Sequence, residues 1–253
     1  MVICRNLMFN PSFHLEFRSY YYTVHSYFLK INVTRLLRKC MAQLLYSENH
    51  SKRKRVSAMK SQKKEIISYF KQMDRGFFMD SNKDLAKFDQ ALPIGFEQTI
   101  SQPSLVLEMT LALDLQPELK VLELGTGSGF QTALLAAFSG SVFTIERIGE
   151  LHHRAKERLA QMDFRNIHFK LGDGSEGWPE HAPFDRIMVT AAASEVPKEL
   201  LEQLGEDGKM VIPVGNAFSQ ELRLIEKDAS GKIYTTLLNE VLFVPLKGKY
   251  ERQ

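Results

Sequence analysis

The stretch Val121-Leu122-Glu123-Leu124-Gly125-Thr126-Gly127-Ser128-Gly129 decides the fold. Apolar residues alternate along its first half, glycine takes every second place in its second half, and the apolar run 132–138 follows. This order predicts a strand, a tight loop and a helix. A dinucleotide-binding loop reads G-x-G-x-x-G, so the shorter G-x-G-x-G spacing favours a different ligand. Glu123 adds an acidic acceptor, which suits a cationic ligand, while a glycine turn in an ordinary α/β protein is the alternative.

A second acidic residue follows at the distance that a nucleoside site requires. Residues 141–145 alternate as a second strand, which ends on Glu146, 21 residues after Gly125. An acidic residue about 20 positions after the loop accepts hydrogen bonds from ribose hydroxyls in Rossmann-like pockets. A solvated glutamate at a strand end is the alternative. Together, the loop and Glu146 resemble the cofactor motifs of class I S-adenosylmethionine-dependent methyltransferases.

Charge divides the chain of 253 residues into two parts. Residues 1–64 carry 13 Lys and Arg against 2 Asp and Glu, whereas residues 65–253 carry 20 against 28. Nucleic acid requires a basic face, so this acidic balance argues against it as a partner of the larger part. Both cysteines, Cys4 and Cys40, lie in the basic part, which leaves the rest without a disulfide or a cysteine metal site. No apolar run approaches the roughly 18 residues of a membrane span.

Residues 1–58 form a basic, aromatic-rich leader that does not read like a domain. We expect it to be disordered or untranslated, with translation beginning at Met41 or Met59. An acid-poor organelle transit peptide and a nuclear or nucleic-acid patch at residues 51–55 are the alternatives. The folded domain is expected over residues 59–253, with substrate-side helices and a loop in 59–115 and an α/β cofactor-binding core in 116–253.

The segment 92–103, Leu-Pro-Ile-Gly-Phe-Glu-Gln-Thr-Ile-Ser-Gln-Pro, is too polar and too interrupted to be core. Ser101 precedes Pro103 by two positions, a pattern that predicts a helix start with the serine hydroxyl as N-cap. The helix is expected over residues 105–115. A helix N-terminus presents free N–H groups and a positive dipole end to anions. Ser101 is therefore either an ordinary cap or part of an anion site.

At this segment the sequence closely resembles the protein-L-isoaspartate O-methyltransferase family. Residues 73–78 (Met-Asp-Arg-Gly-Phe-Phe) resemble the segment that precedes the signature in that family, and further matches follow in order to residue 247. These are residues 121–129, 144–147, 172–174, 183–185 with 191–193, 213–215 and 243–246. One departure is Glu97, where bacterial-looking members often have glycine, and its charge lies near the site of an anionic substrate.

The resemblance implies the fold and the site. The fold is α/β and Rossmann-like, with a mostly parallel seven-stranded sheet, helices on both faces and a C-terminal antiparallel strand. Later strands are expected over residues 167–171, 184–189, 209–214, 222–226 and 233–244, and later helices over 151–162 and 197–204. The catalytic residue is Ser101, which would also bind substrate with Ala192, Val196 and Pro197. Cofactor contacts are expected from Thr99, Ile100, Gln102, Glu123, Gly125, Thr126, Gly127, Ser128, Glu146, Arg147, Asp173, Gly174 and Gln220.

The implied function is protein repair. A methyl group passes from S-adenosylmethionine to the α-carboxylate of L-isoaspartyl, and of D-aspartyl as a further acceptor, in damaged proteins. The acceptor is already ionised at pH 7, so no general base is needed. The resemblance implies a cytoplasmic monomer without nucleic-acid or membrane partners. Methyl transfer to another acceptor, a non-catalytic cofactor-binding module and a nicotinamide oxidoreductase are the alternatives.

Overall fold

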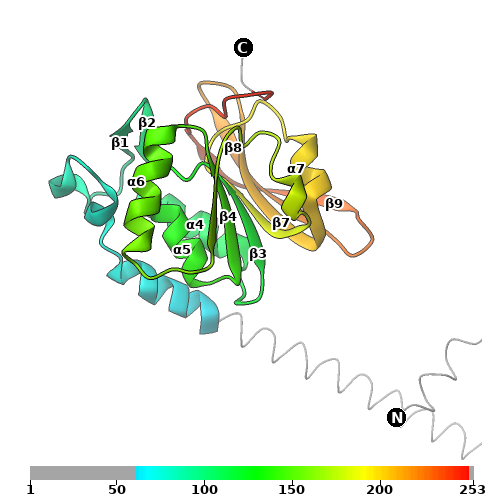
Figure 1. The fold of residues 1–253 in the computed structure, drawn as a ribbon. Helices are drawn as coiled ribbons and strands as arrows, with labels where there is room; N and C mark the ends of the chain where they lie inside the picture. Colours follow the sequence, from blue (N-terminus) through cyan, green and yellow to red (C-terminus); the bar gives the residue numbers. More distant parts are fainter. Residues whose placement is uncertain (1–60, 251–253) are drawn as a thin grey trace, which may run out of the picture. The chain divides into compact units, whose positions relative to one another are not determined.

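The computed structural model describes residues 61–250, and the predicted leader and its alternatives lie outside them. Seven strands form one sheet in the order β5-β4-β3-β6-β7-β8-β9 (Figure 1). Its first five members are parallel: β3 (Lys120–Leu124), β4 (Ser141–Glu146), β5 (Ile167–Leu171), β6 (Phe184–Val189) and β7 (Leu204–Gly215). β8 (Gln220–Lys227) runs antiparallel to β7 and to β9 (Ile233–Val241). The predicted fold class is confirmed.

Alternation along the strands separates two apolar layers. Leu122 and Leu124 of β3 pack in one cluster with Leu200 of α7 (Lys198–Gln203). Val121 faces the other cluster, with Leu113 of α4 (Pro103–Leu113) and residues of α5 (Phe130–Ala137). Successive side chains of a strand point to opposite faces, so helices cover both sides of the sheet, as predicted.

Further helices pack against α5. α6 (Gly149–Ala160) buries Leu151, Ala155 and Leu159, which recur every fourth residue and therefore share one helical face. Leu151 and Leu159 join a cluster with Ile66 of the helix over residues 61–72. Short 3-10 helices occur at η1 (Arg75–Phe78), η2 (Lys83–Leu85) and η3 (Pro179–His181). Among the described residues, no helix is long and apolar enough to cross a membrane.

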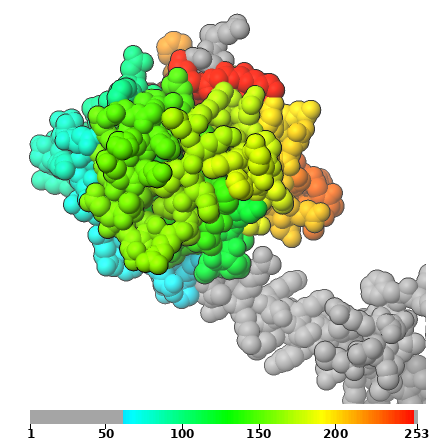
Figure 2. Space-filling model, in the orientation of Figure 1, coloured from blue at the N-terminus to red at the C-terminus, as the bar shows by residue number. Residues whose placement is uncertain are grey.

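A two-stranded hairpin precedes α4. β1 (Leu92–Gly95) pairs with β2 (Gln98–Ile100), so Phe96 and Glu97 form its two-residue turn. Both turn residues have positive φ, +56° and +59°, a region that glycine enters most easily. Both side chains are exposed. The segment that carries this hairpin lies beside α6 at the surface (Figure 2).

Candidate active site

The parallel register of the central strands places the carboxyl ends of β4, β3 and β6 at one edge of the sheet. Leu124 of β3 lies between Ile145 of β4 and Val189 of β6. The next residues along each strand therefore meet at the carboxyl end of the sheet. The chain leaves β3 toward β4 on one side and returns to β6 on the other, the kind of switch point at which open α/β sheets bind ligands.

A cavity opens at this edge. Its walls come from the hairpin and α4, the glycine loop, the ends of β4 and β6, and a segment after β9. Residues lining it are Gln98, Thr99, Ile100, Ser101, Val106, Met109, Leu124, Gly125, Thr126, Gly127, Ser128, Phe130, Gln131, Ile145, Glu146, Arg147, Gly174, Thr190, Ala191, Phe243, Val244, Pro245, Leu246 and Lys247.

The glycine loop is built around Gly125. Its φ is +95°, and a Cβ atom there would lie 2.3 Å from the Thr190 hydroxyl oxygen. That hydroxyl lies 2.8 Å from the Gly125 carbonyl oxygen, to which it donates, so Thr190 ties the loop to the end of β6. Gly125 thus meets two demands, a left-handed backbone and close approach, that only glycine meets together.

We expect Gly125→Ala to destabilise the domain and to abolish cofactor binding, because the added methyl group meets Thr190 and strains the backbone. Gly149→Ala is the matched control, since nothing lies within 4 Å of its Cβ position and it begins α6. Thermal unfolding and calorimetric titration with S-adenosylhomocysteine measure the two effects. A Gly125→Ala protein as stable and as tightly binding as Gly149→Ala would contradict this account.

Glu146 anchors the loop from the end of β4. Only 5% of the residue is exposed, and one carboxylate oxygen accepts the Gly127 N–H at 2.9 Å. The other oxygen accepts the Ile148 N–H, also at 2.9 Å. A carboxylate offers about four lone-pair sites, so Glu146 retains acceptor capacity toward the cavity that it lines.

Glu123 lies beneath the loop and does not line the cavity. It is fully buried, and one oxygen accepts hydrogen bonds from the hydroxyls of Thr132 (2.6 Å) and Thr144 (2.7 Å). The other oxygen has no hydrogen-bond partner among the described residues. Burial raises the pKa of Glu123 to about 8, opposed by these hydroxyls and assisted by the nearby Glu146 charge.

This raised pKa predicts a pH-dependent stability. The folded cofactor-free protein holds the Glu123 proton up to about pH 8, whereas the unfolded chain loses it near the ordinary glutamate pKa of 4.5. The free energy of unfolding should therefore fall as pH rises through this window, by about 1.4 kcal/mol for each unit of pKa shift. Urea unfolding at pH 5 and pH 8 tests it. Glu123→Gln should be less sensitive to pH, and parallel curves for both proteins would disprove the assignment.

Ser101 lines the cavity, but the prediction that it caps the helix is wrong. α4 begins at Pro103, Gln102 is the N-cap residue, and neither its side chain nor that of Ser101 caps the helix. Asp89 instead accepts the Ser104 N–H at 2.8 Å. A carboxylate 15 residues earlier in the sequence thus accepts a backbone N–H at the start of α4. The Ser101 hydroxyl is therefore available to a ligand in the cavity.

The structure brings many predicted site residues together and separates others from the cavity. Thr99, Ile100, Ser101, Gly125, Thr126, Gly127, Ser128, Glu146, Arg147 and Gly174 line it. Gln102, Glu123, Asp173, Ala192, Val196, Pro197 and Gln220 do not.

Several of the separated residues support a wall that sequence reasoning missed, the segment 243–247. The Gln220 side chain accepts the Phe243 N–H at 2.6 Å, and Ala192 exchanges backbone hydrogen bonds with Val244 and Leu246. The Asp173 carboxylate lies against Gly248, where no Cβ would fit. The motif at 243–246 is evident in the sequence, but no local signal predicts that this segment, near the red end of the chain in Figure 2, lines the cavity.

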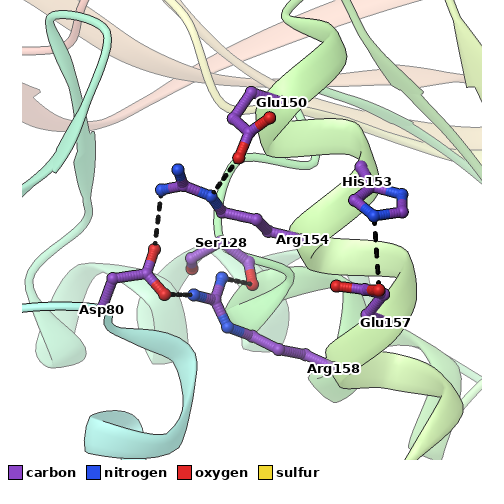
Figure 3. Close-up of polar contacts among 7 residues, drawn as sticks. All are labelled: Asp80, Ser128, Glu150, His153, Arg154, Glu157 and Arg158. Atoms are coloured by element: carbon purple, nitrogen blue, oxygen red, sulfur yellow. Dashed lines mark hydrogen bonds and ion pairs between the residues drawn. The ribbon is translucent and has the colours of Figure 1, made fainter.

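An ionic network supports the glycine loop from outside (Figure 3). Asp80, after η1, forms ion pairs with Arg154 and Arg158 of α6. The Arg158 guanidinium also donates to the Ser128 carbonyl, at 3.4 Å, and only 11% of its side chain is exposed. The network therefore connects the N-terminal part of the domain to the loop. His153 pairs with Glu157 on the exposed side of α6, and neither residue lines the cavity.

The sheet order, the glycine loop and Glu146 define the class of this protein as a class I S-adenosylmethionine-dependent methyltransferase. The model of the protein-L-isoaspartate(D-aspartate) O-methyltransferase family matches residues 49–251. The chain belongs to this family. Its function is therefore that of a protein-repair methyltransferase that uses S-adenosylmethionine.

The relatives agree over most of their length. A protein-L-isoaspartate O-methyltransferase of Dictyoglomus turgidum is 47% identical over 84% of this chain and 92% of its own. A protein-L-isoaspartate O-methyltransferase of Vibrio cholerae is 47% identical over 72% of this chain and 87% of its own. A solved structure described as the Plasmodium falciparum enzyme, in complex with S-adenosyl-L-homocysteine, is 27% identical and covers 68% of this chain and 85% of that one, with a TM-score of 0.60.

Proposed function

We propose that the cavity holds both reactants of the repair reaction. S-adenosylmethionine lies along the glycine loop and Glu146, and the L-isoaspartyl carboxylate lies beside Ser101. One observation carries this proposal: Ser101 and the glycine loop line the same cavity. Gly125, the first glycine of the loop, lies 24 residues after Ser101 in the sequence. A carboxylate and a methyl donor bound at these two walls would face each other.

The residues present fit the cofactor. Gly125 and Gly127 line the cavity, have positive φ and carry no side chain, so a ligand can approach their backbone closely. Glu146 keeps lone pairs for ribose hydroxyls, and Gly174 offers an open backbone for the adenine ring. S-adenosylmethionine would supply a methyl group bonded to a positively charged sulfonium sulfur, which makes that methyl carbon electrophilic. Apolar residues such as Val106, Met109 and Leu246 line another part of the same cavity.

The chain's contribution is orientation rather than proton transfer. An α-carboxylate is ionised near pH 7, so its oxygen attacks the methyl carbon directly as the carbon–sulfur bond breaks. The Ser101 hydroxyl donates to the carboxylate, whereas the first N–H groups of α4 are already accepted by the Asp89 carboxylate and the Gln102 carbonyl. Holding the three atoms in line is catalysis by proximity, worth up to about 7–11 kcal/mol of barrier. The resulting ester cyclises to a succinimide, which hydrolyses partly to aspartate.

We propose that residues 59–253 act as a cytoplasmic monomer on damaged proteins, with D-aspartyl residues as a further acceptor, and without nucleic-acid or membrane partners. The acidic balance of residues 65–253, 20 Lys and Arg against 28 Asp and Glu, supports the exclusion of nucleic acid. Sedimentation of the purified chain tests the monomer directly.

The test of the activity uses two synthetic peptides that differ only in L-isoaspartate against L-aspartate at one position. Labelled methyl from S-adenosylmethionine should enter the isoaspartyl peptide alone, as a base-labile ester. Label on neither peptide, with cofactor binding measured separately, would point to another acceptor or to a binding module.

A further inference from the structure

Arg75 is a buried cation held almost entirely by backbone carbonyls. It is the first residue of η1, and 5% of the residue is exposed. The four N–H groups on its two terminal nitrogens donate to five carbonyl oxygens, at N–O distances of 2.7–3.3 Å, so that two acceptors share one N–H; the carbonyls are those of Ala86, Phe88, Gln90, Ile100 and Ser101. Two of these acceptors, Ile100 and Ser101, line the cavity.

The charge of Arg75 has no direct carboxylate partner. Within residues 61–250, Arg75 forms no ion pair, and its Nε atom has no hydrogen-bond partner. Asp89 is an opposing charge that acts on Arg75, but its carboxylate accepts the Ser104 N–H at the start of α4. A buried charge without a paired carboxylate is costly, so the five carbonyl dipoles must stabilise it.

Building on the proposed function, we propose that Arg75 is a positioning residue for the carboxylate acceptor. It holds the carbonyls of Ile100 and Ser101 on the side away from the cavity and connects them to the loop 86–90. The Ser101 backbone is thereby fixed immediately before α4, where its hydroxyl meets the acceptor.

The geometry requires arginine rather than any cation. The two terminal nitrogens of a guanidinium hold four N–H donors in a rigid planar fork, whereas an ammonium has three donors on a flexible stem. Lysine at position 75 keeps the charge but reaches fewer of the five carbonyls, which frees residues 100 and 101 to move. A displacement of about 1 Å at a reaction centre costs about 100-fold in rate.

Arg186 provides a matched control. It is also buried, at 8% exposure, and also donates to backbone carbonyls, those of Leu113, Asp114, Asp185 and Asp207. None of these residues lines the cavity. Arg75→Lys and Arg186→Lys thus remove similar hydrogen bonds to backbone carbonyls. Only those of Arg75 hold residues that line the cavity, Ile100 and Ser101.

The experiment compares steady-state methylation of an isoaspartyl peptide by the wild type and both variants, at saturating S-adenosylmethionine. We expect Arg75→Lys to lower kcat/KM for the peptide about 10- to 100-fold, with the KM for S-adenosylmethionine within about twofold of wild type. Arg186→Lys should keep both constants, whatever its loss of thermal stability.

Equal kcat/KM for the two folded variants would overturn the proposal, as would a loss in Arg75→Lys that appears equally in cofactor affinity. Should Arg75→Lys unfold alone, saturating cofactor shifts it toward the folded state by mass action, and its turnover is then measured there. Failure to recover folded protein even with cofactor makes Arg75 a folding determinant and also overturns the proposal. Inactivity of the wild type and Arg186→Lys would instead refute the proposed function.

Discussion

Ser101→Ala is expected to lower the kcat of isoaspartyl methylation about 100-fold, the effect typical of removing one hydrogen-bond donor from a reaction centre. The hydroxyl caps no helix, because Gln102 is the N-cap residue of α4 and Asp89 accepts the Ser104 N–H. Folding should therefore not depend on it. Steady-state assays with an isoaspartyl peptide measure the change, and thermal unfolding together with titration of S-adenosylhomocysteine should give wild-type values.

Ser104→Ala is the control for this prediction. Ser104 lies three residues further along, is exposed and interacts through its hydroxyl with the Gln102 side chain at 3.0 Å. It does not line the cavity, so its removal should leave turnover near that of the wild type. Near wild-type turnover in Ser101→Ala would remove Ser101 from the acceptor site.

Glu146→Gln is expected to weaken cofactor binding about 10- to 100-fold. An amide presents one acceptor oxygen instead of two, so either the Gly127 or the Ile148 N–H loses its partner, and a ribose hydroxyl loses an ionised acceptor. Hydrogen bonds to charged groups are worth about 1.5–3 kcal/mol each, and about 1.4 kcal/mol is a tenfold change in affinity. Calorimetric titration with S-adenosylhomocysteine measures the loss.

Asp185→Asn tests whether such a loss is specific. The Asp185 carboxylate also accepts a backbone N–H, from Lys120 at 2.7 Å, but at the opposite end of the sheet. We expect this variant to bind the cofactor like the wild type. Equal affinities of Glu146→Gln and the wild type would show that Glu146 only shapes the loop.

The sequence predicted the sheet well where local patterns decide it. β5 and β6 begin and end at the predicted residues, because alternating apolar positions are bounded by turn residues. The sequence also predicted that the glycine loop and Glu146 lie close together at the edge of the sheet. Parallel strands that follow one another in the sequence end at the same edge, so a residue after each strand meets its neighbours there.

Long-range contacts decided what the sequence did not predict. The helix start at Pro103 depends on Asp89, and the cavity wall at residues 243–247 depends on Gln220 and Ala192. The five carbonyls around Arg75 come from backbone atoms, which leave no pattern in the side chains. The hairpin turn lacked its usual signal, since Phe96 and Glu97 hold positive φ values that glycine or asparagine would ordinarily mark.

The most direct test of the site is a crystal structure of the protein with S-adenosylhomocysteine and an isoaspartyl peptide. We predict the cofactor product along residues 125–129 with its ribose on Glu146, and the peptide carboxylate within hydrogen-bond distance of the Ser101 hydroxyl, facing the sulfur. A peptide carboxylate bound elsewhere, away from both Ser101 and the sulfur, would contradict the account.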